Sequence, residues 1–115
     1  IIKEAYKAAD KLAEDDISCE IIDLRTIRPM DHETIIESVK KTNRLVILEE
    51  AWPFGNISTE ITYQVQSKAF DYLDAPIVKI NTADTPAPYS PVLLKEWLPN
   101  SDDVIKAVKQ VMYID

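Results

Sequence analysis

Two adjacent carboxylates, Glu49 and Glu50, follow the apolar run Leu45–Leu48. Functional groups of α/β folds gather where strands end, so an acid pair at this point could act as a general base. The alternative is structural, because residues 51–56 form a turn and a carboxylate before it would face the positive N-terminus of the next helix. We favour the structural interpretation, since the sequence contains none of the common catalytic motifs.

The single histidine and the single cysteine are the other candidates for chemistry. A catalytic or pH-sensing His32 would need an orienting carboxylate and a pocket, and we expect instead a solvated residue in the first turn of a helix. Cys19 has no basic neighbour in the sequence to lower its pKa, so we expect a packing residue. One cysteine and one histidine exclude multi-cysteine and His-rich metal sites. The sequence therefore predicts no catalytic, cofactor-binding or metal-binding residue in this chain.

Aromatic residues in or beside predicted loops, together with several acidic residues, suggest contacts with other proteins. Loop aromatics anchor interfaces or cover sheet edges, and the sequence leaves both interpretations open for Trp52, Phe54, Tyr72, Tyr89 and Trp97. Five carboxylates could pair with a basic partner or remain solvated, and they lie before the third predicted strand, in the first turn of the final helix and at the last residue: Asp71, Asp74, Asp102, Asp103 and Asp115.

The composition is that of a globular protein. Hydrophobic residues make up 46% and charged residues 29%, which excludes a disordered chain. The net charge of −7 disfavours a nucleic-acid partner and suits a basic protein surface. No apolar stretch approaches the roughly 20 residues that span a bilayer, so we expect no membrane partner. The length corresponds to one domain, residues 1–115.

Predicted helices and strands alternate along the sequence and position the candidate functional residues. This alternation predicts an α/β layer fold. We expect helices through residues 2–13, from Asp31 past Val39, and from about 57 to 68, with Asn56 or Ser58 as the cap of the third. A final helix starts at a Ser101 cap and carries an apolar stripe to Met112. Strands are expected at 19–24, 44–50 and 76–82, followed by a proline-rich loop.

Five segments carry a resemblance to a known family. They are DLRTIRPMD (23–31), SVKKTN (38–43), LVILEEAWP (45–53), AFDYLDAP (69–76) and ADTPAPY (83–89). Together they resemble the C-terminal domain of the beta subunit of thiamine-dependent 2-oxo acid dehydrogenases, most closely of the pyruvate dehydrogenase type. Their order and spacing extend the resemblance over essentially the whole chain.

The resemblance implies a three-layer αβα fold of the transketolase C-terminal type, with a mostly parallel five-stranded sheet. Two strands of the family domain precede the helix with which these 115 residues begin. We therefore expect a domain truncated at its N-terminus, without those strands.

The resemblance also implies a function. The whole enzymes use thiamine diphosphate and magnesium to decarboxylate pyruvate and acetylate lipoyl groups, and their beta-subunit catalytic residues lie in the N-terminal domain. This segment alone is then inactive and serves assembly and partner docking. The expected partners are the alpha subunit, a second beta subunit and the basic subunit-binding domain of dihydrolipoyl acyltransferase.

By position in the family motif, Asp74 is the aspartate that meets the acyltransferase. Ile114 corresponds to the end of the family's chain, and Asp115 adds one residue beyond it. Branched-chain 2-oxo acid or acetoin dehydrogenase beta subunits, and a stand-alone protein-binding module, remain alternatives. The resemblance implies the mitochondrial matrix in a eukaryote and the cytoplasm in a bacterium.

Overall fold

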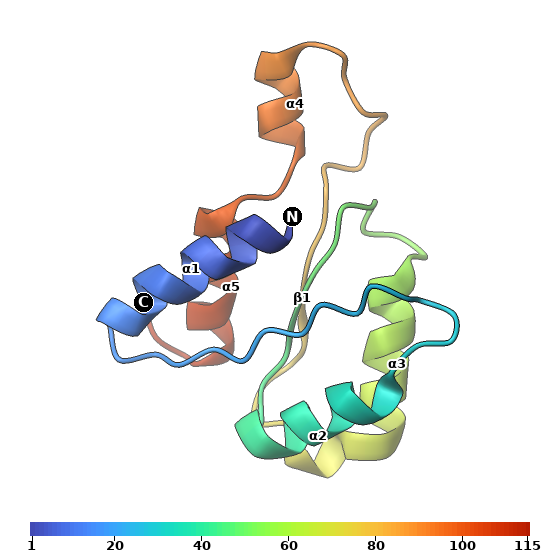
Figure 1. Ribbon diagram of the computed structural model, residues 1–115, viewed down its shortest axis with the longest axis vertical. Coiled ribbons are helices and arrows are strands. Elements are labelled where there is room, and N and C mark those ends of the chain that lie inside the picture. Colours follow the sequence, from blue (N-terminus) through green and yellow to red (C-terminus); the bar gives the residue numbers. More distant parts are fainter.

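Two short parallel strands lie at the centre of the molecule (Figure 1). The computed structural model describes residues 1–115. In chain order the elements are α1 (Ile2–Glu14), α2 (His32–Thr42), β1 (Val46–Leu48), α3 (Ile57–Ala69), the 3₁₀ turn η1 (Phe70–Tyr72), β2 (Val78–Ile80), α4 (Pro91–Trp97) and α5 (Ser101–Val111). The strands pair in register Val46 with Val78, Ile47 with Lys79 and Leu48 with Ile80.

Alternating side chains of the strands bury two separate cores, one on each face of the sheet. Ile47 points into the first core, where buried side chains of α2 and α3 meet, among them Val39 and Val65. Val46 and Leu48 point to the opposite face and pack against Ala8 of α1 and α5 residues. The result is the expected three-layer αβα arrangement, with α1 and α5 on one side and α2 and α3 on the other (Figure 1).

The predicted strand Cys19–Leu24 is wrong. The segment is extended, but residues 18–23 make no backbone hydrogen bond, and a strand exists only when a neighbour supplies the ladder. Its side chains hold it instead: Leu24 packs against the first core, and Glu20 accepts hydrogen bonds from Ser38 and Lys41 of α2. The Ser38 hydroxyl and the Lys41 ammonium lower the pKa of the Glu20 carboxyl. The other two strands are present but shorter than the apolar runs that predicted them.

The proline-rich loop contains a helix that the sequence analysis missed. Pro91 occupies the first turn of α4, where its fixed φ suits a helix and its missing N–H costs nothing. Trp97 is the last residue of this helix, so it lies beside a loop, as predicted. In Figure 1, α4 projects from the layered body. No helix of the protein is long and apolar enough to cross a membrane.

Helix caps follow the sequence only in part. Asp31 caps α2 as predicted and accepts from the Thr34 N–H at 3.1 Å. Asn56 occupies the N-cap position of α3, but its side chain accepts from no N–H of the helix and donates instead to the Phe54 carbonyl. The predicted Ser101 cap of α5 is wrong, because Asn100 one residue earlier accepts from the N–H groups of Asp102 and Asp103. The Asp103 side chain accepts from the Asn100 N–H in return, which completes a capping box.

We expect Asn100→Ala to lower the free energy of unfolding by about 1 kcal/mol, because two helix N–H groups lose their acceptor. Ser101→Ala should change it by less than about 0.5 kcal/mol, since no cap depends on the Ser101 hydroxyl. Thermal or urea unfolding of the two variants measures the difference. Equal losses in both variants would contradict the assignment of the cap to Asn100.

Candidate partner-docking surface

Asp74 lies between η1 and β2, and its backbone is fixed by the end of α2. The Asp74 N–H donates to the Asn43 carbonyl at 2.8 Å, and the Asn43 side-chain amide donates to the Tyr72 carbonyl at 2.9 Å. Asn43 ends α2 with φ +64°, a left-handed conformation that asparagine tolerates better than most residues. Asn43 thus holds the segment Tyr72–Asp74 by both its backbone and its side chain.

The side chain of Arg44 connects Asp74 to the C-terminal helix. Its Nη1 lies 3.7 Å from the Asp74 carboxylate, and its Nε donates to the Val111 carbonyl in the last turn of α5 at 2.9 Å. Beyond Val111, the Ile114 N–H donates to the Lys109 carbonyl at 3.0 Å, so the chain end folds back on the helix. Arg44 therefore links Asp74 to the last turn of α5, which precedes Ile114 and Asp115. We call Asp74, Ile114 and Asp115 the docking surface.

The docking surface is accessible. The Asp74 side chain is 58% exposed in spite of its ion pair, Ile114 is 45% exposed, and Asp115 is exposed. Two cations lie near the segment that carries Asp74: Arg44 pairs with Asp74 itself, and Lys40 lies over the Tyr72 ring at 5.7 Å.

Sequence reasoning missed Asn43 and Arg44, which position Asp74. The hydrogen bond from Arg44 to Val111 joins residues 67 positions apart, and no local sequence pattern predicts such a contact. The signals in the sequence were weak: an asparagine at the end of a predicted helix and a lone arginine before an apolar strand.

Glu49 has the structural role that the sequence favoured. Its carboxylate accepts from the Ser58 N–H in the first turn of α3 at 3.3 Å, from the Ser58 hydroxyl, and from the Asn81 amide at 2.8 Å. Ser58 is fully buried, so these bonds join the ends of β1 and β2 to the start of α3. The neighbouring Glu50 is exposed and makes no side-chain hydrogen bond. The pair therefore does not form a shared acid–base site.

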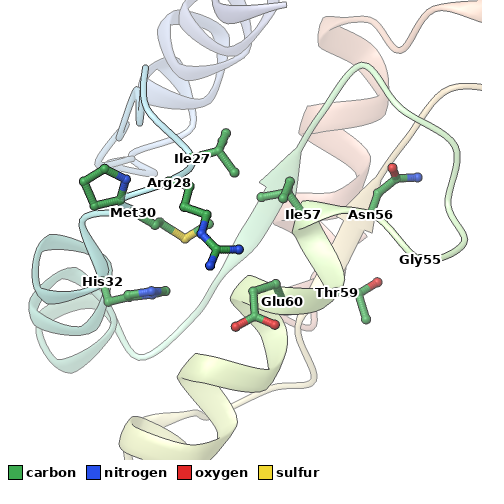
Figure 2. Close-up of a pocket in the computed structure, with 10 residues that line it drawn as sticks. Ile27, Arg28, Met30, His32, Gly55, Asn56, Ile57, Thr59 and Glu60 are labelled. Atoms are coloured by element: carbon green, nitrogen blue, oxygen red, sulfur yellow. The ribbon is translucent and has the colours of Figure 1, made fainter.

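An open depression of about 850 Å³ lies between the segment 27–32 and the start of α3 (Figure 2). His32 lines it and is half-buried, so the expectation of a solvated histidine is only partly right. Its buried Nδ1 has no hydrogen-bond partner, and no carboxylate bonds to the ring to orient it as a base. Figure 2 shows Arg28 beside His32 and Glu60 across from them on α3.

The residues of this chain do not form a set of ligands for the cofactors that the resemblance implies. No group of three or more His, Cys, Asp or Glu side chains could hold a metal ion. The Glu49 carboxylate, which stands at the end of β1, already accepts three donors from protein groups. No step through thiamine diphosphate or magnesium is therefore assigned to these residues.

Burial raises the pKa of the Cys19 thiol, which lowers its thiolate fraction at neutral and mildly alkaline pH. We expect Cys19 to react with iodoacetamide about ten times more slowly at pH 8 than an exposed thiol. An exposed α3 position offers the matched comparison, Ser67→Cys in a Cys19→Ala background. Mass spectrometry over time measures both rates, and equal rates would contradict the assignment of Cys19 to packing.

The two tryptophans share one acceptor at the carboxyl end of the strands. The indole N–H groups of Trp52 and Trp97 donate to the Thr85 carbonyl at 2.9 and 2.8 Å. Phe54 is 88% exposed and Tyr89 completely so. Tyr72 in η1 is also exposed. The interface interpretation of these aromatics stays a prediction.

Residues 1–104 match the family described as "Transketolase, C-terminal domain". The chain therefore belongs to this family, in agreement with the three-layer fold.

The chain is also similar to individual proteins of known name. The chain is 54% identical over 112 residues to the pyruvate dehydrogenase E1 component subunit beta of Rickettsia felis, which covers 97% of this chain and 34% of that protein. It is 56% identical over 109 residues to the subunit of the same name from Rhizobium meliloti, which covers 95% of this chain and 24% of that protein. It is 48% identical over 109 residues to the mitochondrial subunit beta-1 of Arabidopsis thaliana, covering 95% of this chain and 30% of that protein. The chain thus spans about a third or less of the length of these relatives.

Proposed function

We propose that residues 1–115 form one transketolase C-terminal-like domain that serves assembly and partner docking in a pyruvate dehydrogenase E1 beta subunit. The observation that carries the proposal is the link through Arg44 between Asp74 and the last turn of α5. The family resemblance assigns Asp74 and the end of the family's chain to one partner, and this link connects Asp74 to the turn that precedes Ile114 and Asp115. The similarity to E1 beta subunits over almost the whole chain supports the assignment.

The surface area supports an assembled state. A monomeric protein of 13.1 kDa is expected to expose about 6,400 Å², whereas this chain exposes 7941 Å². The excess of about 1,500 Å² is surface that the rest of a beta subunit or a partner subunit would cover in the whole enzyme. The partners we propose are the alpha subunit, a second beta subunit and the dihydrolipoyl acyltransferase.

In the whole enzyme we propose oxidative decarboxylation of pyruvate and acetyl transfer to lipoyl groups, with thiamine diphosphate and magnesium held by residues outside this chain. The bacterial relatives and those named mitochondrial support a cytoplasmic location in a bacterium and a matrix location in a eukaryote. Assays of the whole enzyme on pyruvate, branched-chain 2-oxo acids and acetoin test the substrate. Activity of the isolated 115 residues would overturn the proposal of a non-catalytic role.

Titration of the whole enzyme with the isolated subunit-binding domain of its acyltransferase tests the docking role. We expect saturable binding that weakens at least about tenfold between roughly 50 and 300 mM salt, because acidic side chains meet a basic partner and ions screen the contact. Absence of binding, or binding that does not depend on salt, would contradict the proposal.

A further inference from the structure

The Arg44 side chain makes two contacts, one with Asp74 of the docking surface and one with the last turn of α5. Nε donates to the Val111 carbonyl at 2.9 Å, which is a normal hydrogen-bond distance. Nη1 lies 3.7 Å from Asp74 Oδ2, which is a longer and weaker contact. The side chain is 34% exposed, so two-thirds of it is packed inside the protein. The hydrogen bond to the Val111 carbonyl therefore fixes the guanidinium group, and the contact with the Asp74 carboxylate is the weaker of the two.

Two roles for such an arginine have opposite consequences. A counter-ion that competes with the partner would have to leave Asp74 when the partner arrives, and its removal would strengthen docking. A positioning residue would stay in place, and its removal would weaken docking by freeing the groups it holds. The bond to Val111 favours the second role, because it keeps Arg44 in place whether or not a partner binds Asp74.

The surroundings of Arg44 also favour positioning. The guanidinium reaches a carbonyl in the last turn of α5, where a cation is stabilised by the negative end of the helix. Ile114 and Asp115 follow that turn in the sequence. Asn43, which precedes Arg44 in the chain, makes hydrogen bonds to the segment Tyr72–Asp74. Two consecutive residues, Asn43 and Arg44, therefore hold this segment and the last turn of α5.

We propose that Arg44 is a positioning residue for partner docking, which holds the Asp74 carboxylate and the C-terminal turn in the relative arrangement that one basic partner recognises. The inference rests on the proposed docking function. Asp74 keeps one carboxylate oxygen free of the Arg44 contact, and its exposure leaves that oxygen available to a cationic side chain of the partner.

The test compares Arg44→Met and Arg44→Lys in the whole enzyme with the acyltransferase subunit-binding domain as the probe. Lysine keeps the charge, but its three N–H donors leave a single nitrogen, so it cannot reach Val111 and Asp74 from two separate nitrogens as Arg44 does through Nε and Nη1. We expect both variants to bind about ten times more weakly, mainly through faster dissociation. Lys40→Met removes a nearby cation that contacts Tyr72 rather than Asp74, and it should change binding less than about twofold.

Hydrogen exchange of the unbound enzyme supplies a readout that does not depend on the partner. The Asp74 and Ile114 amides, which donate to Asn43 and Lys109, should exchange about ten times faster in both Arg44 variants. Unchanged exchange with unchanged or tighter binding would overturn the positioning role. Asp74→Asn separates the two hypotheses: if it weakens binding and the Arg44 variants do not, only the inference fails. If Asp74→Asn also binds normally, the docking function itself fails.

Discussion

Asp74→Lys should weaken binding of the acyltransferase subunit-binding domain to the whole enzyme about 100-fold. The substitution removes an exposed carboxylate and puts a cation in front of a basic partner, and loss of one member of an interfacial charge pair has effects of this size. The introduced ammonium group would also face Arg44, whose guanidinium lies 3.7 Å from the present carboxylate. Calorimetric titration at low salt measures the change.

Asp71→Lys is the matched control for Asp74→Lys. Asp71 lies three residues earlier, is exposed and undergoes the same change of charge, but it makes no side-chain contact with Arg44. We expect its effect to stay below about fivefold, because a charge at the rim of an interface acts mainly by long-range attraction. Equal losses in the two variants would mean that net charge, and not the Asp74 position, determines docking.

The second large effect concerns Glu49, whose carboxylate joins both strand ends to α3. Glu49→Ala should lower the free energy of unfolding by about 3 kcal/mol, because the N–H and hydroxyl of the fully buried Ser58 lose their acceptor. The Asn81 amide keeps only its longer contact with the Trp52 carbonyl, at 3.4 Å. The exposed Glu50→Ala should change it by less than about 0.5 kcal/mol. Thermal unfolding measures both variants.

The same pair of variants distinguishes a structural from a catalytic carboxylate. A whole enzyme that carries Glu49→Ala should show lower stability, and its residual folded fraction should turn over pyruvate at the normal rate. Normal stability with loss of turnover would contradict the structural role and would return Glu49 to the candidates for a general base.

Much of the fold could be predicted from local patterns. Apolar spacing predicted four helices, and Asp31 was found as a cap because its side chain bonds to an N–H three residues away. The strand at Cys19–Leu24 could not be predicted correctly in the same way. Its apolar residues have the composition of a strand, but pairing depends on a neighbour that local sequence does not specify. The α4 helix was missed because Pro91 was interpreted as a loop residue, whereas it occupies the first turn of the helix.

The residues of the docking surface could not be identified from local sequence patterns either. Asp74, Ile114 and Asp115 were identified by resemblance, and no pattern in the residues distinguishes Asp74 from the exposed Asp71. What distinguishes it is the contact with Arg44, which depends on the packing of α5 beside the sheet. The structural role of Glu49 was predictable, since the carboxylate and the start of α3 are separated only by a short turn.

The central claim is that the partner binds at Asp74 and the chain end. A structure of the whole enzyme bound to the acyltransferase subunit-binding domain, by electron cryo-microscopy, tests it most directly. We predict a basic side chain of the partner within hydrogen-bond distance of Asp74 and further contacts at Ile114 and Asp115. A partner seated at the opposite end of the sheet, on Trp52, Phe54 or Tyr89, would contradict the claim and would assign docking to the exposed aromatics.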